Sequence, residues 1–273
     1  MLFFYGFIAL SAVGAAILAP QLASGIWIPL LWLGLFAGFF LALLILFALV
    51  IWISSLFVDM SKVQEKYNRY YGFMARQLVD LVMKLAGIHV HKTGLEMVPE
   101  DGVFLLVSNH IADLDPAVFL HALPRARLAF VSKRENERIY MVNKYMHAIQ
   151  CQSINRENDR EALKTILRTA EILREGVHCM GIFPEGYESK TGDLLPFRNG
   201  AFKIAQRAHV PIVVAVLRNT KSIAKNIFRR RTDVDMEILG VIPADALVGV
   251  TTRDLGDRVH RMMETALEQK GAV

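Results

Sequence analysis

Residues 108–116 read SNHIADLDP and bring a histidine and two aspartates close together in the chain. They directly follow the apolar run VFLLV at 103–107, which predicts a buried strand. The loop after this strand can fold His110 and Asp115 back onto each other. A carboxylate that accepts a hydrogen bond from one ring nitrogen fixes the histidine tautomer and leaves the other nitrogen as a base. Because histidine takes up and returns a proton near neutral pH, the pair predicts general acid–base chemistry at a strand end.

The residue after Asp115 supports a second interpretation of the same stretch. Proline biases the residue before it away from helical dihedrals and suits the first position of a helix. The pattern therefore predicts a helix that begins at Pro116 with Asp115 as its N-cap. In this interpretation Asp115 contributes only a cap of about 1 kcal/mol, and His110 is an ordinary loop residue. This stretch alone leaves both interpretations open.

Three further stretches also combine apolar runs with charged residues or a predicted strand. GIFPEGYESKTG (181–192) follows an apolar run and exposes Glu185 in a Pro-Glu-Gly turn. The segment between the first stretch and this one contains Lys133 and Arg156, cations that can form charge-assisted hydrogen bonds to a phosphate. HVPIVVAV (209–216) predicts another buried strand.

Together these stretches resemble the lysophosphatidic acid acyltransferase family (1-acyl-sn-glycerol-3-phosphate O-acyltransferases) within the glycerolipid acyltransferase superfamily. The resemblance covers about residues 85–217 and rests on four motifs in the family's order and spacing. The matching residues are Asn109, His110 and Asp115 (NHxxxxD), Lys133, Glu135, Ile154 and Arg156 (KxE…IxR), Phe183 to Gly186 (FPEG), and Val210 to Ile212 (VPI). Each motif alone is weak, whereas four in this order are specific.

The resemblance implies direct acyl transfer without an acyl-enzyme intermediate. His110 would deprotonate the sn-2 hydroxyl of 1-acyl-glycerol-3-phosphate, with Asp115 orienting the imidazole, and the alkoxide would attack the thioester of acyl-CoA or acyl carrier protein. Backbone N–H groups of the 109–115 turn are candidates to stabilise the oxyanion. The expected substrate-binding residues are Asn109, Lys133, Arg156, Glu185, Gly186 and Lys190. The acyl thioester is a co-substrate, and neither a metal ion nor a bound cofactor is implied.

Two positions after the FPEG motif depart from the common family pattern FPEGTR. Tyr187 stands in place of the Thr and Glu188 in place of the Arg, and a carboxylate beside a phosphate dianion is repulsive. Either Glu188 points away from the phosphate or the acceptor differs, and Lys190 is a candidate substitute for the missing cation. A different lysophospholipid or a lyso-aminolipid is therefore an alternative acceptor. In the second motif Tyr140 and Asn143 replace the Pro and Gly that are usual in the family. The family pattern therefore does not predict the conformation of that loop.

Other functional classes fit the sequence less well. A non-catalytic membrane lipid-binding module would not need both His110 and Asp115. The eight histidines are scattered and form no HExxH pattern, which argues against a zinc hydrolase. The net charge of +5 suits anionic partners, and membrane anchoring favours lipid headgroups over nucleic acid as that partner.

The first 58 residues contain no Lys, Arg, Asp or Glu. Since about 20 apolar residues span a bilayer, Met1–Ala19 and Pro29–Val58 predict two transmembrane helices joined by a turn at PQLASG (20–25). Gly34 and Gly38 form a GxxxG pattern, which predicts close approach of the two helices. A cleaved signal peptide is the alternative for the first segment, although that segment has no basic n-region.

Positive charges predict the orientation of the chain. Lys62, Lys66 and Arg69 follow the second apolar segment, so the positive-inside rule places residues 59–273 in the cytoplasm. We expect a hairpin anchor over 1–58 in the cell membrane and a cytoplasmic acyltransferase domain over 59–273. An interfacial helix within 59–87 would lead from one to the other.

The rest of the sequence alternates short apolar runs with helical patterns, which predicts an α/β fold. We expect a mixed, largely parallel sheet flanked by helices, as in glycerolipid acyltransferases, preceded by the transmembrane helical hairpin. The predicted strands are 102–107, 126–132, 149–154, 177–183, 211–217 and 234–241. Besides the helix from Pro116, the predicted helices are 61–86, 160–176, 200–208 and 252–268.

Overall fold

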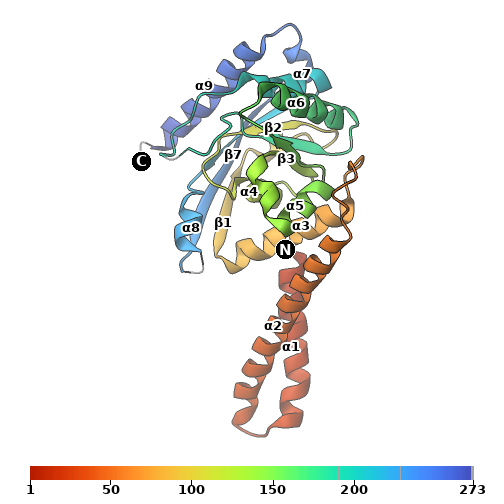
Figure 1. Cartoon of the computed structure of the whole chain (residues 1–273). Coiled ribbons are helices and arrows are strands. Elements are labelled where there is room, and N and C mark those ends of the chain that lie inside the picture. Colours follow the sequence, from red (N-terminus) through yellow and green to blue (C-terminus); the bar gives the residue numbers. More distant parts are fainter. Residues whose placement is uncertain (190, 228, 272–273) are drawn as a thin grey trace.

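The computed structural model of the chain describes residues 1–189, 191–227 and 229–271. A long helical hairpin at the N-terminus projects from an α/β body (Figure 1). The body contains one mixed, largely parallel sheet covered by helices on both faces. The predicted fold class, including the hairpin that precedes the sheet, is confirmed.

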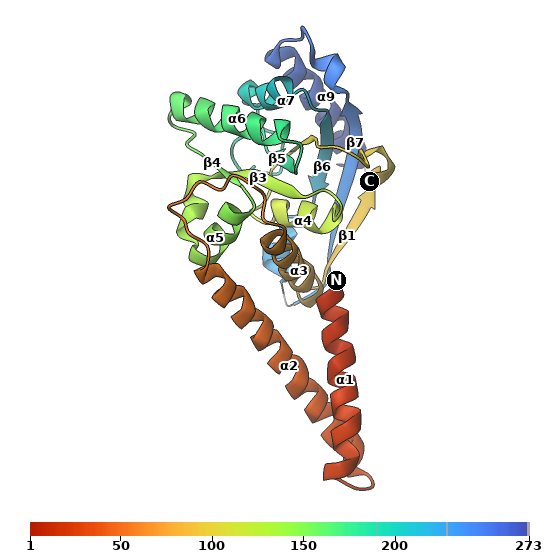
Figure 2. The same cartoon turned by 90° about the vertical axis from the view of Figure 1, so that its right-hand side faces the viewer.

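The hairpin consists of α1 (Leu2–Leu22) and α2 (Trp27–Leu56). Both helices are long and apolar enough to cross a bilayer, and only 17% and 11% of their most apolar windows are buried. A core helix of the same composition would be covered by protein. The two helices diverge toward the body (Figure 2), where α1 contacts α3 (Arg69–Leu85) and α2 contacts α5 (Tyr140–Ala148).

Two details of the predicted hairpin are wrong. Helix α1 continues through Pro20 into the predicted turn, because the fixed φ of proline is close to the helical value and only one hydrogen bond is lost. The GxxxG glycines make no close contact, since a Cβ on Gly34 or Gly38 would meet nothing within 4 Å. The close approach is instead at Gly14, whose Cβ would lie 2.9 Å from the ring of Phe39.

The helix predicted at 61–86 begins later than expected, because Asn68 caps α3. The side-chain oxygen of Asn68 accepts hydrogen bonds from two backbone N–H groups of the first turn, at 3.0 and 3.4 Å. Residues 59–68 form an irregular connection instead, in which the side chain of Gln150 donates to the carbonyl of Gln64 at 2.8 Å. This partner lies 86 residues further along the chain, so local periodicity could not reveal it.

Within the described ranges the sheet has seven strands in the order β1-β7-β6-β2-β5-β3-β4. Every neighbouring pair is parallel except β6 and β7, which are antiparallel. The strands are β1 (Ile88–Thr93), β2 (Leu105–Ser108), β3 (Leu128–Lys133), β4 (Gln152–Ile154), β5 (Cys179–Ile182), β6 (Ile212–Arg218) and β7 (Thr232–Ile242). The six predicted strands are all present. The unpredicted strand β1 lies at an edge and is mostly exposed, so its sequence IHVHKT lacks the apolar run of a buried strand.

Two hydrophobic clusters lie on opposite faces of the sheet. Strand β2 contributes Leu105 and Val107 to one cluster, and the residues Phe104 and Leu106 belong to the other. All four are at most 1% exposed, so β2 is held by packing on both faces. The first cluster includes α6 (Asp159–Arg174), α7 (Lys203–Ala208) and α9 (Thr252–Gly271), and the second includes α3, α4 (Asp115–Ala122) and α8 (Ser222–Asn226).

Four parallel strands, β2, β5, β3 and β4, run side by side in the sheet. Their carboxyl ends meet at one edge, so the loops that follow them are neighbours in space although they are far apart in sequence. These loops contain the three motifs predicted to do chemistry. The sheet therefore gathers these motifs on a rigid support.

Helix α5 occupies the loop of the second motif and was not predicted. Tyr140 and Asn143, which replace the usual Pro and Gly, lie within this helix, and both residue types tolerate helical dihedrals better than Pro or Gly. The hydroxyl of Tyr145 on α5 forms a 2.6 Å hydrogen bond with that of Ser54 on α2. The second motif is thereby attached to the hairpin.

Candidate active site

His110 and Asp115 face each other across the loop between β2 and α4. Nδ1 of His110 lies 2.9 Å from Oδ2 of Asp115. The same oxygen accepts the backbone N–H groups of Ile111 and Ala112 at 2.6 and 2.9 Å, and Asp115 is fully buried. Because an ionised carboxylate only accepts hydrogen bonds, Nδ1 carries the proton and Nε2 is left as the acceptor.

This geometry decides between the two interpretations of Asp115. Helix α4 begins at Asp115 itself, and Leu114 occupies the cap position without a side-chain cap hydrogen bond. The prediction of a helix that begins at Pro116 with Asp115 as its N-cap is therefore wrong. The carboxylate turns back toward the preceding loop because the imidazole and two backbone N–H groups converge on one of its oxygens.

Asn109 and Glu185 are buried residues that hold the loop in place. The Asn109 amide pairs with the backbone N–H and carbonyl of Leu217 on β6, at 2.8 and 3.0 Å. Glu185 accepts the backbone N–H groups of His110 at 2.6 Å and Leu195 at 2.9 Å. Burial raises the pKa of Glu185, and these two hydrogen bonds oppose that shift. Their side chains bond backbone groups, and neither is among the residues that line the cavity described below.

Three consecutive backbone N–H groups of this loop already have acceptors. That of His110 donates to Glu185, and those of Ile111 and Ala112 donate to Asp115. These three groups, which were candidates to stabilise an oxyanion, are therefore occupied.

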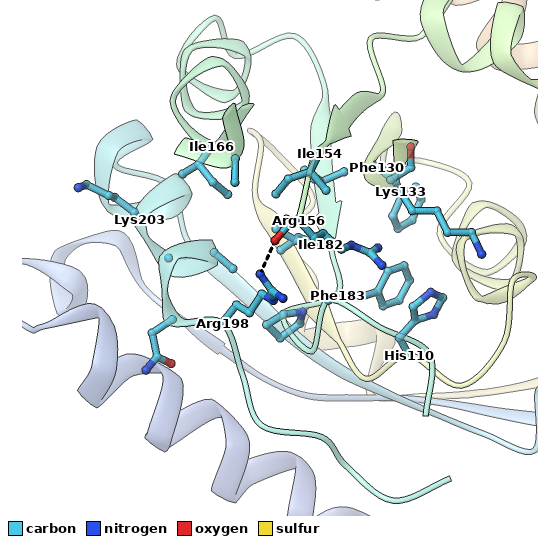
Figure 3. A pocket seen from close by; sticks show the side chains of 18 of the residues that line it. His110, Phe130, Lys133, Ile154, Arg156, Ile166, Ile182, Phe183, Arg198 and Lys203 are labelled. Carbon is cyan, nitrogen blue, oxygen red and sulfur yellow. Dashed lines mark hydrogen bonds between the residues drawn. The ribbon is translucent and has the colours of Figure 1, made fainter. Parts of the chain in front are cut away.

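A cavity of about 510 Å³ opens beside the dyad. His110 and Lys133 lie at one end of it and point toward each other (Figure 3). The rest of its wall is largely apolar, and includes Phe130, Val131, Ile154, Leu163, Ile166 and Ile182. The site thus joins a proton acceptor to a space suited to hydrocarbon.

Lys133 is engaged by two carboxylates at the mouth of the site. Its Nζ lies 2.8 Å from Asp113 Oδ1 and 3.0 Å from Glu188 Oε1. The bond to Asp113 raises the pKa of Lys133 and lowers that of the Asp113 carboxyl. Glu188 does not point away from the site, since its Oε1 also lies 3.9 Å from Nε2 of His110. The ammonium of Lys133 is therefore already neutralised by these acids.

Arg156 and a second arginine, Arg198, lie on Tyr187. Their guanidinium carbons are 5.1 and 5.4 Å from the centroid of the Tyr187 ring. Both line the cavity, together with Gly186. Arg198 belongs to no motif and was missed by the sequence analysis, although LLPFRNG (194–200) follows the third motif closely. The remaining predicted residue, Lys190, lies outside the described residues.

The geometry and the comparisons with known proteins agree. The sequence profile described as Acyltransferase matches residues 89–218, which contain both members of the dyad and all four motifs. Residues 89–218 are an acyltransferase domain. The matched region extends from β1 to the end of β6, so it includes most of the residues that line the cavity.

Relatives with assigned names point to one branch of the family. The chain is 30% identical to a 1-acyl-sn-glycerol-3-phosphate acyltransferase of Borreliella burgdorferi, over 55% of this chain and 59% of that protein. It is 34% identical to the human 1-acyl-sn-glycerol-3-phosphate acyltransferase beta, over 59% of this chain and 58% of that protein. The chain therefore spans about three fifths of the length of these relatives.

A solved structure shares the fold. The crystal structure of the 1-acyl-sn-glycerophosphate (LPA) acyltransferase PlsC from Thermotoga maritima superposes with a TM-score of 0.61. The match covers 84% of this chain and 90% of that chain at 21% identity. The shared architecture includes most of the chain.

Proposed function

We propose that the protein is a membrane-bound 1-acyl-sn-glycerol-3-phosphate O-acyltransferase. It transfers an acyl chain from acyl-CoA or acyl carrier protein to the sn-2 hydroxyl of 1-acyl-glycerol-3-phosphate, which gives phosphatidic acid for phospholipid synthesis. The observation that carries this proposal is the His110–Asp115 pair at the end of a largely apolar cavity. The names of the relatives support the same acceptor.

His110 acts as the general base and then as the general acid. Its Nε2 takes the proton of the sn-2 hydroxyl while that oxygen attacks the thioester carbonyl carbon. When the tetrahedral intermediate collapses, the C–S bond breaks and the imidazolium returns the proton to the departing sulfur. Asp115 holds the proton on Nδ1 and stabilises the positive charge that forms on the ring. No covalent acyl-enzyme is needed.

The hairpin supplies the membrane anchor in this proposal. Its two exposed apolar helices are long enough to cross the hydrocarbon core of a bilayer. Lys62, Lys66 and Arg69 follow α2 and favour a cytoplasmic position for the body. The acceptor and the product are both lipids, so anchoring keeps the site beside its substrate.

One observation favours a second candidate acceptor. Near Nε2 of His110, the two negative charges of Asp113 and Glu188 exceed the single positive charge of Lys133. A lyso-aminolipid, whose headgroup has a cationic amine, would fit these acids better than a phosphate dianion does. The chemistry at His110 would be unchanged.

Lipid mass spectrometry tests both candidates. The full-length protein in detergent micelles is offered 1-acyl-glycerol-3-phosphate or a lyso-aminolipid, with acyl-CoA or acyl carrier protein as donor. We expect phosphatidic acid from wild type and a loss of at least about 10²-fold in rate in His110→Ala. Acylation of the aminolipid alone would overturn the proposed acceptor. Full retention of activity in His110→Ala would overturn the mechanism.

A further inference from the structure

A run of cations follows β6, outside the candidate active site. Residues 219–231 read NTKSIAKNIFRRR and contain five Lys or Arg and no Asp or Glu. Three of these cations, Lys225, Arg229 and Arg230, are exposed and form no ion pair among the residues that the structure describes. We call these three residues the α8 patch. Its positive charge is not neutralised within the described protein.

The backbone holds the α8 patch in a fixed turn. Ile223 on α8 is 1% exposed and belongs to the second hydrophobic cluster. The carbonyl of Asn226 accepts the backbone N–H groups of Arg229 and Arg230 at 2.8 and 3.1 Å. The side-chain oxygen of Asn226 accepts Nε of Arg230 at 2.6 Å. Because the turn is already ordered, binding of a partner to these cations costs less conformational entropy than binding to a flexible loop.

The α8 patch lies on the same side of the body as the hairpin. In Figure 1, and again in the side view of Figure 2, α8 is at the end of the body from which the hairpin projects. The chain just after the patch meets the end of α3, where the N–H of Thr232 donates to the carbonyl of Gly87 at 2.9 Å. Helix α3 in turn contacts α1, with 5.8 Å between the rings of Phe73 and Phe3. A bilayer that contains the hairpin therefore has its surface beside the patch.

The α8 patch is also connected to the loop that contains the dyad. Strand β6 ends at Arg218 and leads directly into the basic run. The amide of Asn109, next to His110, bonds both backbone groups of Leu217 at 2.8 and 3.0 Å. Contact between the patch and a surface would therefore hold the dyad loop at a defined position relative to that surface.

We propose that the α8 patch binds the headgroups of anionic lipids and forms a second attachment of the body to the membrane, in addition to the hairpin. Lys and Arg residues beside an anionic membrane surface each strengthen binding about fivefold. The position of the patch on the hairpin side favours a lipid surface over an acidic protein as the partner. This inference rests on the membrane anchoring in the proposed function.

The test measures how close α8 lies to the lipid headgroups. The full-length protein carries a fluorophore at Ala224→Cys, an exposed position on α8, and Cys151 and Cys179 are replaced by Ala. Energy transfer to a headgroup-labelled lipid is measured in vesicles of phosphatidylcholine, alone or with about 30% phosphatidylglycerol. The same fluorophore at Val248→Cys, a 71% exposed position before α9, is the positional control.

Two variants with the same loss of charge are compared with wild type. One replaces all three residues of the α8 patch by Gln. The control replaces Lys164, Arg207 and Arg258 by Gln, which are exposed on α6, α7 and α9 and do not line the cavity. We expect phosphatidylglycerol to raise energy transfer from α8 in wild type and in the control, and salt to reverse this rise. The patch variant should have a ratio of docked to undocked molecules at least about tenfold lower.

The outcomes separate this inference from the proposed function. Equal energy transfer in the patch variant and the control would overturn the docking, as would transfer that is independent of phosphatidylglycerol. A raised KM for acyl carrier protein in the patch variant, with unchanged energy transfer, would assign the patch to that acidic protein instead. Failure of the wild type to float with phosphatidylcholine vesicles would overturn the hairpin anchoring and this inference with it. Absence of acyl transfer with intact charge-dependent docking would overturn only the proposed reaction.

Discussion

The imidazole of His110 lies flat on the ring of Phe183, with 4.3 Å between centroids and 16° between planes. Phe183 in turn stacks on Phe130, at 5.9 Å and 7°. Asp115 fixes the imidazole through one nitrogen, while this stack fixes the plane of its ring. The Phe of the FPEG motif is thus a positioning residue for the base.

We expect Phe183→Leu to lower kcat by about two- to tenfold, because an aromatic contact contributes about 0.5–1.5 kcal/mol beyond area burial. The KM of both substrates should change little, since the cations and the apolar wall are retained. Steady-state kinetics with both substrates varied give this split. Phe197→Leu, in a ring pair outside the His110 stack, is the control. A changed KM with an intact kcat would refute the positioning role.

A second prediction concerns Asp115. Asp115→Asn keeps the size of the side chain but removes the charge that stabilises the imidazolium. We expect kcat to fall by at least about 10²-fold with a nearly unchanged acceptor KM. Asp245→Asn is the matched control, since the Asp245 side chain is 97% exposed. Near-normal turnover of Asp115→Asn would show that the carboxylate serves only the fold of the loop.

A third prediction uses the acids around Lys133. Glu188→Gln removes a negative charge that lies 3.9 Å from Nε2 of His110 and releases Lys133 from one of its two partners. For a phosphate-bearing acceptor we expect KM to fall by about two- to fivefold, which is the range of partly exposed ion pairs. The KM is compared with that of Glu171→Gln, a substitution of an exposed residue on α6. A higher KM would favour an acceptor with a cationic headgroup.

The sequence predicts the fold well where the signal is local. Apolar runs identify strands β2 to β7, and α6 ends close to the predicted residues. Elements that depend on distant partners are missed. Strand β1 forms by pairing with β7, which is distant in sequence. Helix α5 packs through Tyr145 against α2, which is also distant in sequence. The hairpin contact at Gly14 depends on how each of the two helices is rotated about its own axis, and a GxxxG pattern does not specify that rotation.

In the candidate site, too, the sequence predicts features that depend on local spacing and misses those that depend on distant partners. Motif spacing predicts His110 and Asp115 as partners, because a separation of five residues leaves few alternatives. It cannot tell that Asn109 and Glu185 point into the protein, since both bond backbone groups far away in sequence. The missed residue, Arg198, is recognisable only once the fold brings its loop beside the FPEG turn.

The last prediction concerns His178, which precedes β5 at the amino edge of the sheet. The residue is 1% exposed, and neither ring nitrogen has a hydrogen-bond partner among the described residues. Its ring packs against that of Tyr67 at 4.9 Å. Burial, with a smaller contribution from Arg127, lowers the pKa of His178 from 6.5 to about 4. The unfolded chain therefore binds a proton at a pH where the folded chain does not.

Stability must accordingly fall as pH drops from about 6.5 to 4, by about 3 kcal/mol from this residue. We expect His178→Phe to keep the ring contact and to remove this part of the pH dependence, with no loss of stability at pH 7 because no hydrogen bond is broken. Thermal unfolding in detergent between pH 7 and pH 4.5 measures this pH dependence of stability. His89→Phe, on the exposed edge strand β1, is the control. Parallel pH profiles for wild type and His178→Phe would mean that folding does not lower the pKa of His178.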